Sequence, residues 1–105
     1  MNAKLISEVM DCLAEAAPRD SRMILFGSHA RGEARADSDL DFLVVEPEVA
    51  DQAAEVIRLS TVLGKRLIPA DVVVMSRSAF ERQRQIPNTL AYRIAQEGVA
   101  RESVR

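Results

Sequence analysis

The sequence predicts a small β-sheet with helices packed against it. Three short runs of apolar and β-branched residues, each next to a glycine or a proline, are typical of buried strands. Apolar residues at helical spacing precede, separate and follow these runs, which predicts the element order α-β-α-β-α-β-α. With 105 residues and neither a repeat nor a linker, the chain is expected to form one domain over residues 1–105, with its core at about 3–99.

The first elements are a helix and a strand. Apolar residues recur every three or four positions over residues 3–17, which indicates an amphipathic helix. Pro18 ends this helix because proline cannot continue the backbone hydrogen bonding. Arg22–Phe26 is a short apolar run closed by Gly27, and it is expected to be a buried strand.

A second strand, a long helix and a third strand follow. Residues 39–46 become rich in strand-forming residues toward their end and stop at Pro47. The apolar spacing between residues 49 and 67 indicates a helix, with Gly64 near its end. The β-branched run Asp71–Met75 is expected to be the third strand.

Two short helices are predicted near the C-terminus. Ser78 and Glu81 have the spacing of a capping box, in which the two side chains bond to the first backbone N–H groups of a helix. Pro87 interrupts this helix. Residues 88–96 then read as the last helix, with Gly98 at the position just after its end.

Two regions are expected to be incompletely packed. The tail Arg101–Arg105 has few apolar side chains and is expected to fray. Three strands make a narrow sheet, so much of one sheet face is expected to remain open to a substrate or a partner.

Composition excludes several classes of protein. The hydrophobic fraction of 48% and the charged fraction of 29% exclude wholesale disorder. The net charge of −2 argues against binding to duplex DNA, which usually needs a strongly basic face. No apolar run approaches the roughly 18 residues that span a bilayer, and no leader opens the chain, so no membrane association is expected. The single cysteine, Cys12, cannot form an internal disulfide, and the expected location is cytoplasmic.

The stretch LFGSHARG is a candidate anion site. Gly27 allows a sharp turn after the strand, and a short helix over residues 28–32 would present backbone N–H groups and the Ser28 hydroxyl to an anion. A plain strand-to-helix turn with Ser28 as N-cap accounts for the same residues. The phosphate-binding Walker loop does not, because Glu33 and Ala34 stand where that motif needs lysine and serine or threonine.

Asp39 and Asp41 are candidate metal ligands. On a strand, residues two apart point to the same face, and two charges about 4 Å apart repel by roughly 4 kcal/mol at an effective dielectric of about 20. A solvated loop would tolerate such a pair, but the apolar run Phe42–Val45 follows at once and places it at the mouth of a buried strand. A divalent cation would turn the repulsion into coordination, and carboxylate oxygens suit magnesium.

Asp71 adds a third carboxylate. It opens the next β-branched run, so its strand could lie beside that of Asp39 and Asp41. Three carboxylates from two adjacent strands are the ligand set of a two-metal phosphoryl or nucleotidyl transfer site. Taken alone, Asp71 would be an exposed acid at the start of a strand.

These motifs together resemble the signature of the DNA polymerase beta-like nucleotidyltransferase superfamily. The signature consists of Gly27-Ser28, ten intervening residues, and then Asp39-Leu40-Asp41. The chain looks like the minimal nucleotidyltransferase branch of this superfamily in its motif GSHARG, its short length and its late segment YRIAQEGV. The resemblance covers about residues 25–99, most of the chain.

The resemblance implies an α+β nucleotidyltransferase fold with a short mixed β-sheet flanked by helices. It also implies Mg²⁺, with two ions expected, and transfer of a nucleoside monophosphate to an acceptor hydroxyl with release of pyrophosphate. By position, Gly27 and Ser28 would hold the triphosphate, and Asp39 and Asp41 would bind the metals. Asp71 would complete the metal site and help to deprotonate the acceptor.

Neighbouring polar residues have less defined roles. Arg31 is expected either to contact a phosphate or to be a solvated surface residue. His29, the only histidine, is interpreted as a turn residue, because its position varies freely in the signature and Asp71 is available as a base. Asp37 is interpreted as a loop residue.

The resemblance also indicates a partner. Minimal members usually act beside a separate helical protein of the HEPN type, and in one group the nucleotidyltransferase is an antitoxin that adenylylates a tyrosine of a HEPN ribonuclease toxin. The expected reaction is therefore transfer of AMP from ATP to a HEPN-type partner, with homo- or hetero-oligomers both open. The alternatives are transfer to a small-molecule hydroxyl, and a non-catalytic module that neutralises its partner by binding.

Overall fold

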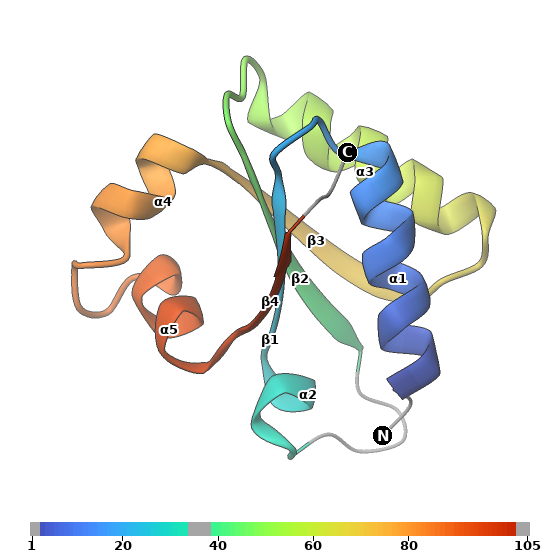
Figure 1. The fold of residues 1–105 in the computed structure, drawn as a ribbon, viewed down its shortest axis with the longest axis horizontal. Helices are drawn as coiled ribbons and strands as arrows, with labels where there is room; N and C mark the ends of the chain where they lie inside the picture. Colours follow the sequence, from blue (N-terminus) through green and yellow to red (C-terminus); the bar gives the residue numbers. More distant parts are fainter. Residues whose placement is uncertain (1–2, 34–38, 103–105) are drawn as a thin grey trace.

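The computed structural model describes residues 3–33 and 39–102. The helices are α1 (Ala3–Ala16), α2 (Ser28–Arg31), α3 (Gln52–Lys65), α4 (Arg77–Gln83) and α5 (Leu90–Glu97). The strands are β1 (Arg22–Phe26), β2 (Leu40–Glu46), β3 (Ala70–Ser76) and β4 (Val99–Glu102) (Figure 1). The predicted α+β class, a short mixed sheet flanked by helices, is confirmed.

The sheet places the starts of two strands side by side. Its strand order is β3-β2-β1-β4, with β1 antiparallel to both neighbours and β2 parallel to β3. In this register Asp41 lies opposite Phe26, the last residue of β1, and opposite Asp71 in β3. The end of β1 and the starts of β2 and β3 therefore meet at one end of the sheet.

The sheet has four strands rather than the three predicted. β4 pairs antiparallel with β1, and Arg101 and Glu102 lie opposite Met23 and Arg22. The prediction of a frayed tail is therefore wrong for Arg101 and Glu102, whereas residues 103–105 lie outside the described residues. Backbone pairing needs no apolar side chains, and β4 covers an edge of β1 that would otherwise be left unpaired.

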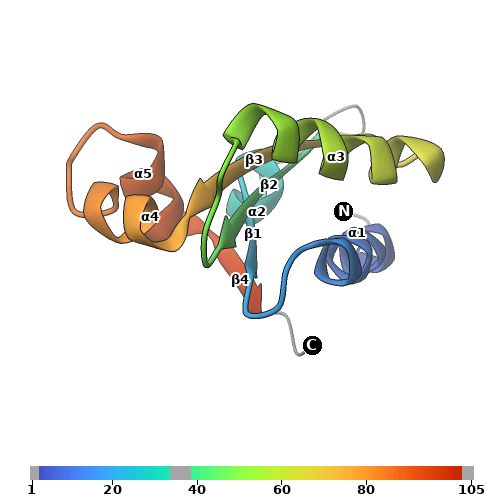
Figure 2. The same cartoon turned by 90° about the horizontal axis from the view of Figure 1, so that it is seen from above.

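Helices cover both faces of the sheet, so the prediction of an open face is wrong (Figure 2). β2 divides its side chains between two cores because successive residues of a strand point to opposite faces. Phe42 and Val44 pack with α1 and α3. Leu43 and Val45 pack with α4 and α5, including Phe80. The end of the sheet at which Asp41 and Asp71 lie therefore belongs to a sheet that is buried on both sides.

Two of the predicted helix starts are displaced. Ser76, the last residue of β3, is the N-cap of α4, and its hydroxyl accepts a hydrogen bond of 3.2 Å from Ala79 N. The predicted capping box at Ser78 is therefore wrong, because the helix begins as soon as the strand ends. The last helix was predicted to begin at residue 88. It begins at Leu90, after the N-cap Thr89, whose hydroxyl accepts a 3.1 Å hydrogen bond from Tyr92 N.

Gly98 follows α5 as predicted, but for a different reason. Its backbone is extended, with φ −73° and ψ 152°, and not left-handed. A Cβ at this position would clash with Ile24 Cγ2 and would lie 2.7 Å from the Ile94 carbonyl oxygen. Glycine therefore allows the end of α5 to approach β1 closely before β4 begins.

Candidate active site

The turn between β1 and α2 is built on glycines. Gly27 has φ 78° and ψ −157°, a conformation that is essentially restricted to glycine. It is the N-cap of α2, a single turn in which Arg31 N bonds to the Gly27 carbonyl at 3.1 Å. Gly32, with φ 72°, ends the turn in the left-handed region. The interpretation of Ser28 as N-cap is therefore wrong, and Ser28 is instead the first residue of the helix.

The turn lies directly against a carboxylate. A Cβ at Gly27 would lie 2.5 Å from Asp41 Oδ2, so only glycine leaves room for this side chain. Asp41 is half-buried at the second position of β2, and it lies opposite Phe26, the residue that precedes Gly27. The two halves of the sequence signature are thus brought together in space.

The three predicted carboxylates interact electrostatically. Asp39 is exposed and immediately precedes β2 rather than lying on it, whereas Asp71 is exposed in β3 beside Asp41. Burial raises the pKa of Asp41, and the negative charges of Asp71 and Asp39 raise it further. His29 and Arg31 oppose this shift of the pKa. The site is therefore a set of mutually repelling acids beside two basic residues.

The carboxylates fit a metal in chemistry but not as a preformed cage. Three carboxylate side chains offer the hard oxygen ligands that magnesium prefers, and their repulsion would be relieved by a cation. Among the described residues, however, no three His, Cys, Asp or Glu side chains are placed so that they could hold a metal ion. Asp39 and Asp71 are both exposed, and their side chains would have to turn toward Asp41.

Arg31 is already engaged by two acids. Its Nε donates to Glu33 Oε1 at 2.7 Å, and its Nη1 donates to Glu97 Oε1, on α5, at 3.1 Å. These carboxylates, Glu33 above all, raise the pKa of Arg31. Arg31 is therefore bound by two carboxylates rather than simply solvated, and its contact with a phosphate stays a prediction. Asp37, interpreted as a loop residue, lies outside the described residues.

Sequence reasoning missed a buried acid pair at the other end of β2. Glu46 is 2% exposed, and burial, followed by its hydrogen bond to Glu55, raises its pKa to about 8. Arg58 bonds to both Glu55 carboxylate oxygens at 2.7 and 2.8 Å and lowers the pKa of Glu55 to about 2. The sequence signal that could have revealed this pair was Glu46 itself, an acid at the end of the apolar run of β2. Glu97 was missed as well, and 66 positions separate it from Arg31.

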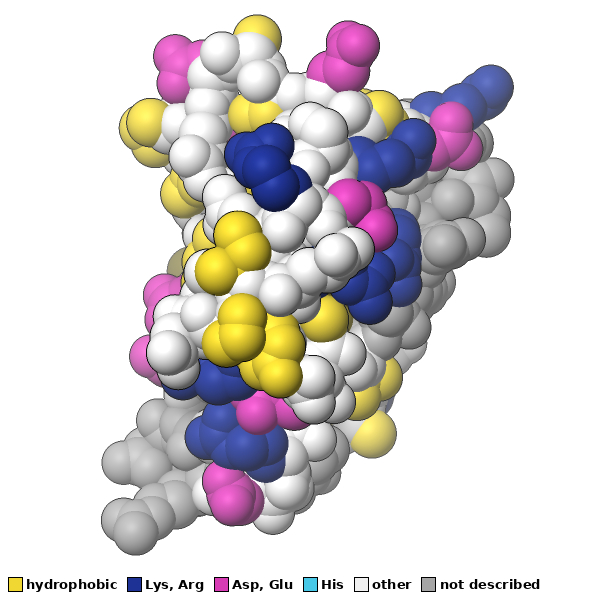
Figure 3. All heavy atoms as spheres, turned by 90° about the vertical axis from the view of Figure 1, so that its left-hand side faces the viewer, with side chains coloured by type: hydrophobic (Ala, Val, Ile, Leu, Met, Phe, Trp, Pro, Cys, Tyr) yellow, Lys and Arg dark blue, Asp and Glu magenta, His cyan; other side chains and the backbone are white. Residues whose placement is uncertain are grey.

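The outer face of α4 and α5 carries an apolar patch. Hydrophobic side chains gather at the middle of this face, with Lys or Arg side chains above and below them (Figure 3). Ile86 and Leu90 are 48% and 37% exposed.

None of the helices within residues 3–33 and 39–102 is long and apolar enough to cross a membrane.

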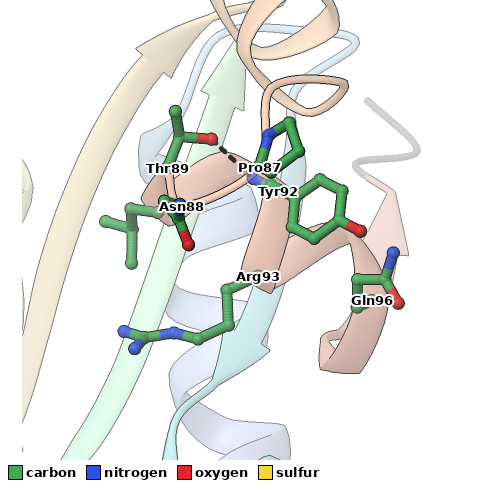
Figure 4. A pocket seen from close by; sticks show the side chains of 7 residues that line it. Pro87, Asn88, Thr89, Tyr92, Arg93 and Gln96 are labelled. Carbon is green, nitrogen blue, oxygen red and sulfur yellow. Dashed lines mark hydrogen bonds between the residues drawn. The ribbon is translucent and has the colours of Figure 1, made fainter.

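A pocket of about 540 Å³ opens beside α5 (Figure 4). Its lining comes from α5 and the loop before it, and consists of Pro87, Asn88, Thr89, Leu90, Tyr92, Arg93 and Gln96. Asp39, Asp41 and Asp71 do not contribute to it. The pocket is therefore separate from the acid cluster.

Replacing Gly27 by Ala is expected to destabilise the chain by about 1–3 kcal/mol, because alanine does not adopt this backbone conformation. The added Cβ would also push Asp41 out of place. Urea unfolding measures the loss. Gly32→Ala is the matched control, since Gly32 also has positive φ but nothing within 4 Å of an added Cβ. Equal losses in the two variants would show that the contact with Asp41 is unimportant.

Solved structures share this fold. A Sulfolobus solfataricus protein, provisionally assigned as a nucleotidyltransferase, is 26% identical with a TM-score of 0.56, over 75% of this chain and 70% of that chain. A toxin–antitoxin structure with AMP-PNP has a TM-score of 0.61 at 23% identity, over 95% of this chain and 72% of that chain. The toxin–antitoxin MntA–HpeT, carrying two Asp-to-Glu substitutions, has a TM-score of 0.61 at 20% identity, over 90% and 69%.

The family assignment comes from the sequence match. No curated protein matches the chain. The nucleotidyltransferase domain family matches residues 6–96, which include β1 to β3 and the whole acid cluster. The predicted resemblance to nucleotidyltransferases is confirmed. The two toxin–antitoxin structures share the fold with this chain, and the minimal branch stays a prediction. The chain belongs to the nucleotidyltransferase domain family.

Proposed function

We propose that this chain transfers AMP from ATP to a hydroxyl group of a partner protein. The observation that carries the proposal is the contact between the Gly27–Ser28 turn and Asp41, which lies beside Asp71 in the parallel strand pair. The turn can seat a triphosphate where the carboxylates can act on it. The family generally uses a nucleoside triphosphate and a divalent metal.

Each residue of the cluster has a proposed role. The backbone around Gly27 and the Ser28 hydroxyl would bind phosphate oxygens. Asp39, Asp41 and Asp71 would hold Mg²⁺, with two ions expected, and the metal would neutralise the charge of the triphosphate. The half-buried Asp41 would be the fixed ligand, whereas the exposed Asp39 and Asp71 would turn toward it.

Asp71 is the proposed base. It is exposed in β3, so an acceptor hydroxyl can approach it from solvent. Asp71 would take the hydroxyl proton as the acceptor oxygen forms a bond to the α-phosphorus. The bond from that phosphorus to the bridging oxygen then breaks, and pyrophosphate leaves.

The proposed acceptor belongs to another protein. The described pocket beside α5 is separate from the acid cluster, and Asp71 faces solvent. Two structures with the same fold come from toxin–antitoxin assemblies, one of them solved with AMP-PNP. Together with the sequence resemblance, these support a HEPN-type helical partner and an antitoxin role, which we place in the cytoplasm.

A labelling assay tests the proposal. The purified chain is mixed with α-³²P-ATP, MgCl₂ and a lysate of the source organism, and label is expected on a protein band. Chelation of Mg²⁺ by EDTA and the variant Asp39→Asn should both abolish the label. Label found only on a small molecule would refute the protein acceptor, and the absence of all label would refute nucleotidyl transfer.

A further inference from the structure

Arg31 connects two parts of the fold. It is the last residue of α2, and its guanidinium bonds to Glu33 in the following loop and to Glu97 at the end of α5. The side chains of Arg31 and Glu97 are 39% and 20% exposed, so the contact is partly shielded from water. The turn that follows β1 is thereby tied to the helix that precedes β4.

Glu97 lies at an end of α5 that packs closely against β1. It is the last residue of α5, and the next residue, Gly98, donates a 2.7 Å hydrogen bond to the Ile94 carbonyl and packs against Ile24 of β1. A carboxylate at a helix C-terminus faces the negative end of the helix dipole, which is unfavourable. Arg31 supplies the positive charge that offsets this position.

Arg31 also lies within electrostatic reach of the acid cluster. Its positive charge lowers the pKa of Asp41. Arg31 also ends the single helical turn that follows Gly27. A triphosphate bound on this turn would offer phosphate oxygens to the same guanidinium. Glu97 and the phosphates would then be rival acceptors for its N–H groups.

We propose that Glu97, with Glu33, restrains Arg31: the two carboxylates hold its guanidinium until phosphate oxygens replace Glu97. Glu97 is thus a positioning residue that acts through Arg31 and sets the affinity for the nucleotide. This inference rests on the proposed function, because it assumes that the Gly27–Ser28 turn binds a triphosphate.

Calorimetric titration with AMP-PNP and MgCl₂ tests this role. Glu97→Gln keeps the shape of the side chain but removes its charge, so Arg31 is released more easily. The dissociation constant is expected to fall about two- to five-fold, the range for a partly exposed ion pair. The KM for ATP should fall by the same factor while kcat is unchanged. In an Arg31→Gln background, Glu97→Gln should have no such effect.

The matched control is Glu81→Gln, which removes a similar exposed pair with Arg84 at 3.2 Å on α4. Unchanged or weaker binding by folded Glu97→Gln would overturn the inference. Equal tightening in the Arg31→Gln background or in Glu81→Gln would overturn it too, by showing a general effect of charge.

Two further outcomes separate this inference from the proposed function. If the unsubstituted chain binds AMP-PNP and Glu97→Gln binds it equally, only the restraint on Arg31 is refuted. If the unsubstituted chain does not bind, the triphosphate site is refuted and the restraint with it. Should Glu97→Gln fail to fold, Glu33→Gln removes the other carboxylate from Arg31, and tighter binding is again the expected result.

Discussion

Asp41→Asn is expected to lower the rate of nucleotidyl transfer by about 100-fold or more, and to make the ligand-free chain more stable. The loss of activity follows because Asp41 is the half-buried member of the proposed metal ligands, and such charge-stabilising groups contribute about 100-fold or more to the rate. The gain in stability follows because burial and the charges of Asp71 and Asp39 raise the pKa of Asp41. A raised carboxyl pKa means that ionisation opposes folding at neutral pH.

Two measurements check this pair of effects. Differential scanning fluorimetry of the ligand-free variant should show a higher midpoint than the unsubstituted chain, and Mg²⁺ with ATP should raise the midpoint of the unsubstituted chain alone. Labelled AMP transfer reports the activity. Glu8→Gln, an exposed acid on α1, is the control and should change neither. A variant that keeps its transfer rate would exclude Asp41 from the site.

Glu46→Gln is expected to remove much of the dependence of stability on pH. Glu46 has an ordinary pKa of 4.5 and a pKa of about 8 in the folded chain, so between these values the folded state binds more protons than the unfolded state. Stability is then fully present below about pH 4.5 and falls as the pH rises toward 8, by at most about 1.4 kcal/mol per pH unit. The amide of Gln cannot ionise and can still donate to Glu55.

Urea unfolding at several pH values between 5 and 8.5 measures the effect. The Glu46→Gln variant should be the more stable form near pH 8, with the difference shrinking toward pH 5. Glu55 does not alter this window, because its pKa of about 2 makes its contribution disappear only as the pH falls below about 4.5. Glu48→Gln, an exposed acid two positions later, should keep the unsubstituted slope. Parallel curves for Glu46→Gln would contradict the buried acid pair.

Local patterns in the sequence were sufficient to predict the main helices and strands and to identify the signature. The apolar run Arg22–Phe26 is β1 with the predicted bounds, and β3 extends the predicted Asp71–Met75 by one residue at each end. Gly27 forms the predicted sharp turn with positive φ. These features depend on side-chain periodicity and on the conformations that single residues allow, which act over a few positions. The roles of Asp39, Asp41 and Asp71 remain predictions.

The features that local patterns could not reveal all depend on strand order and register. The pairing of β4 with β1 joins residues about 80 positions apart and corrects the predicted frayed tail. The parallel register places Asp71 beside Asp41, which was expected from the sequence without knowledge of the strand order, and another order of the same strands would have separated them. The contact between Arg31 and Glu97 spans 66 positions. Such contacts form only when distant segments pack against one sheet, because their free energy comes from neighbours that the local sequence does not contain.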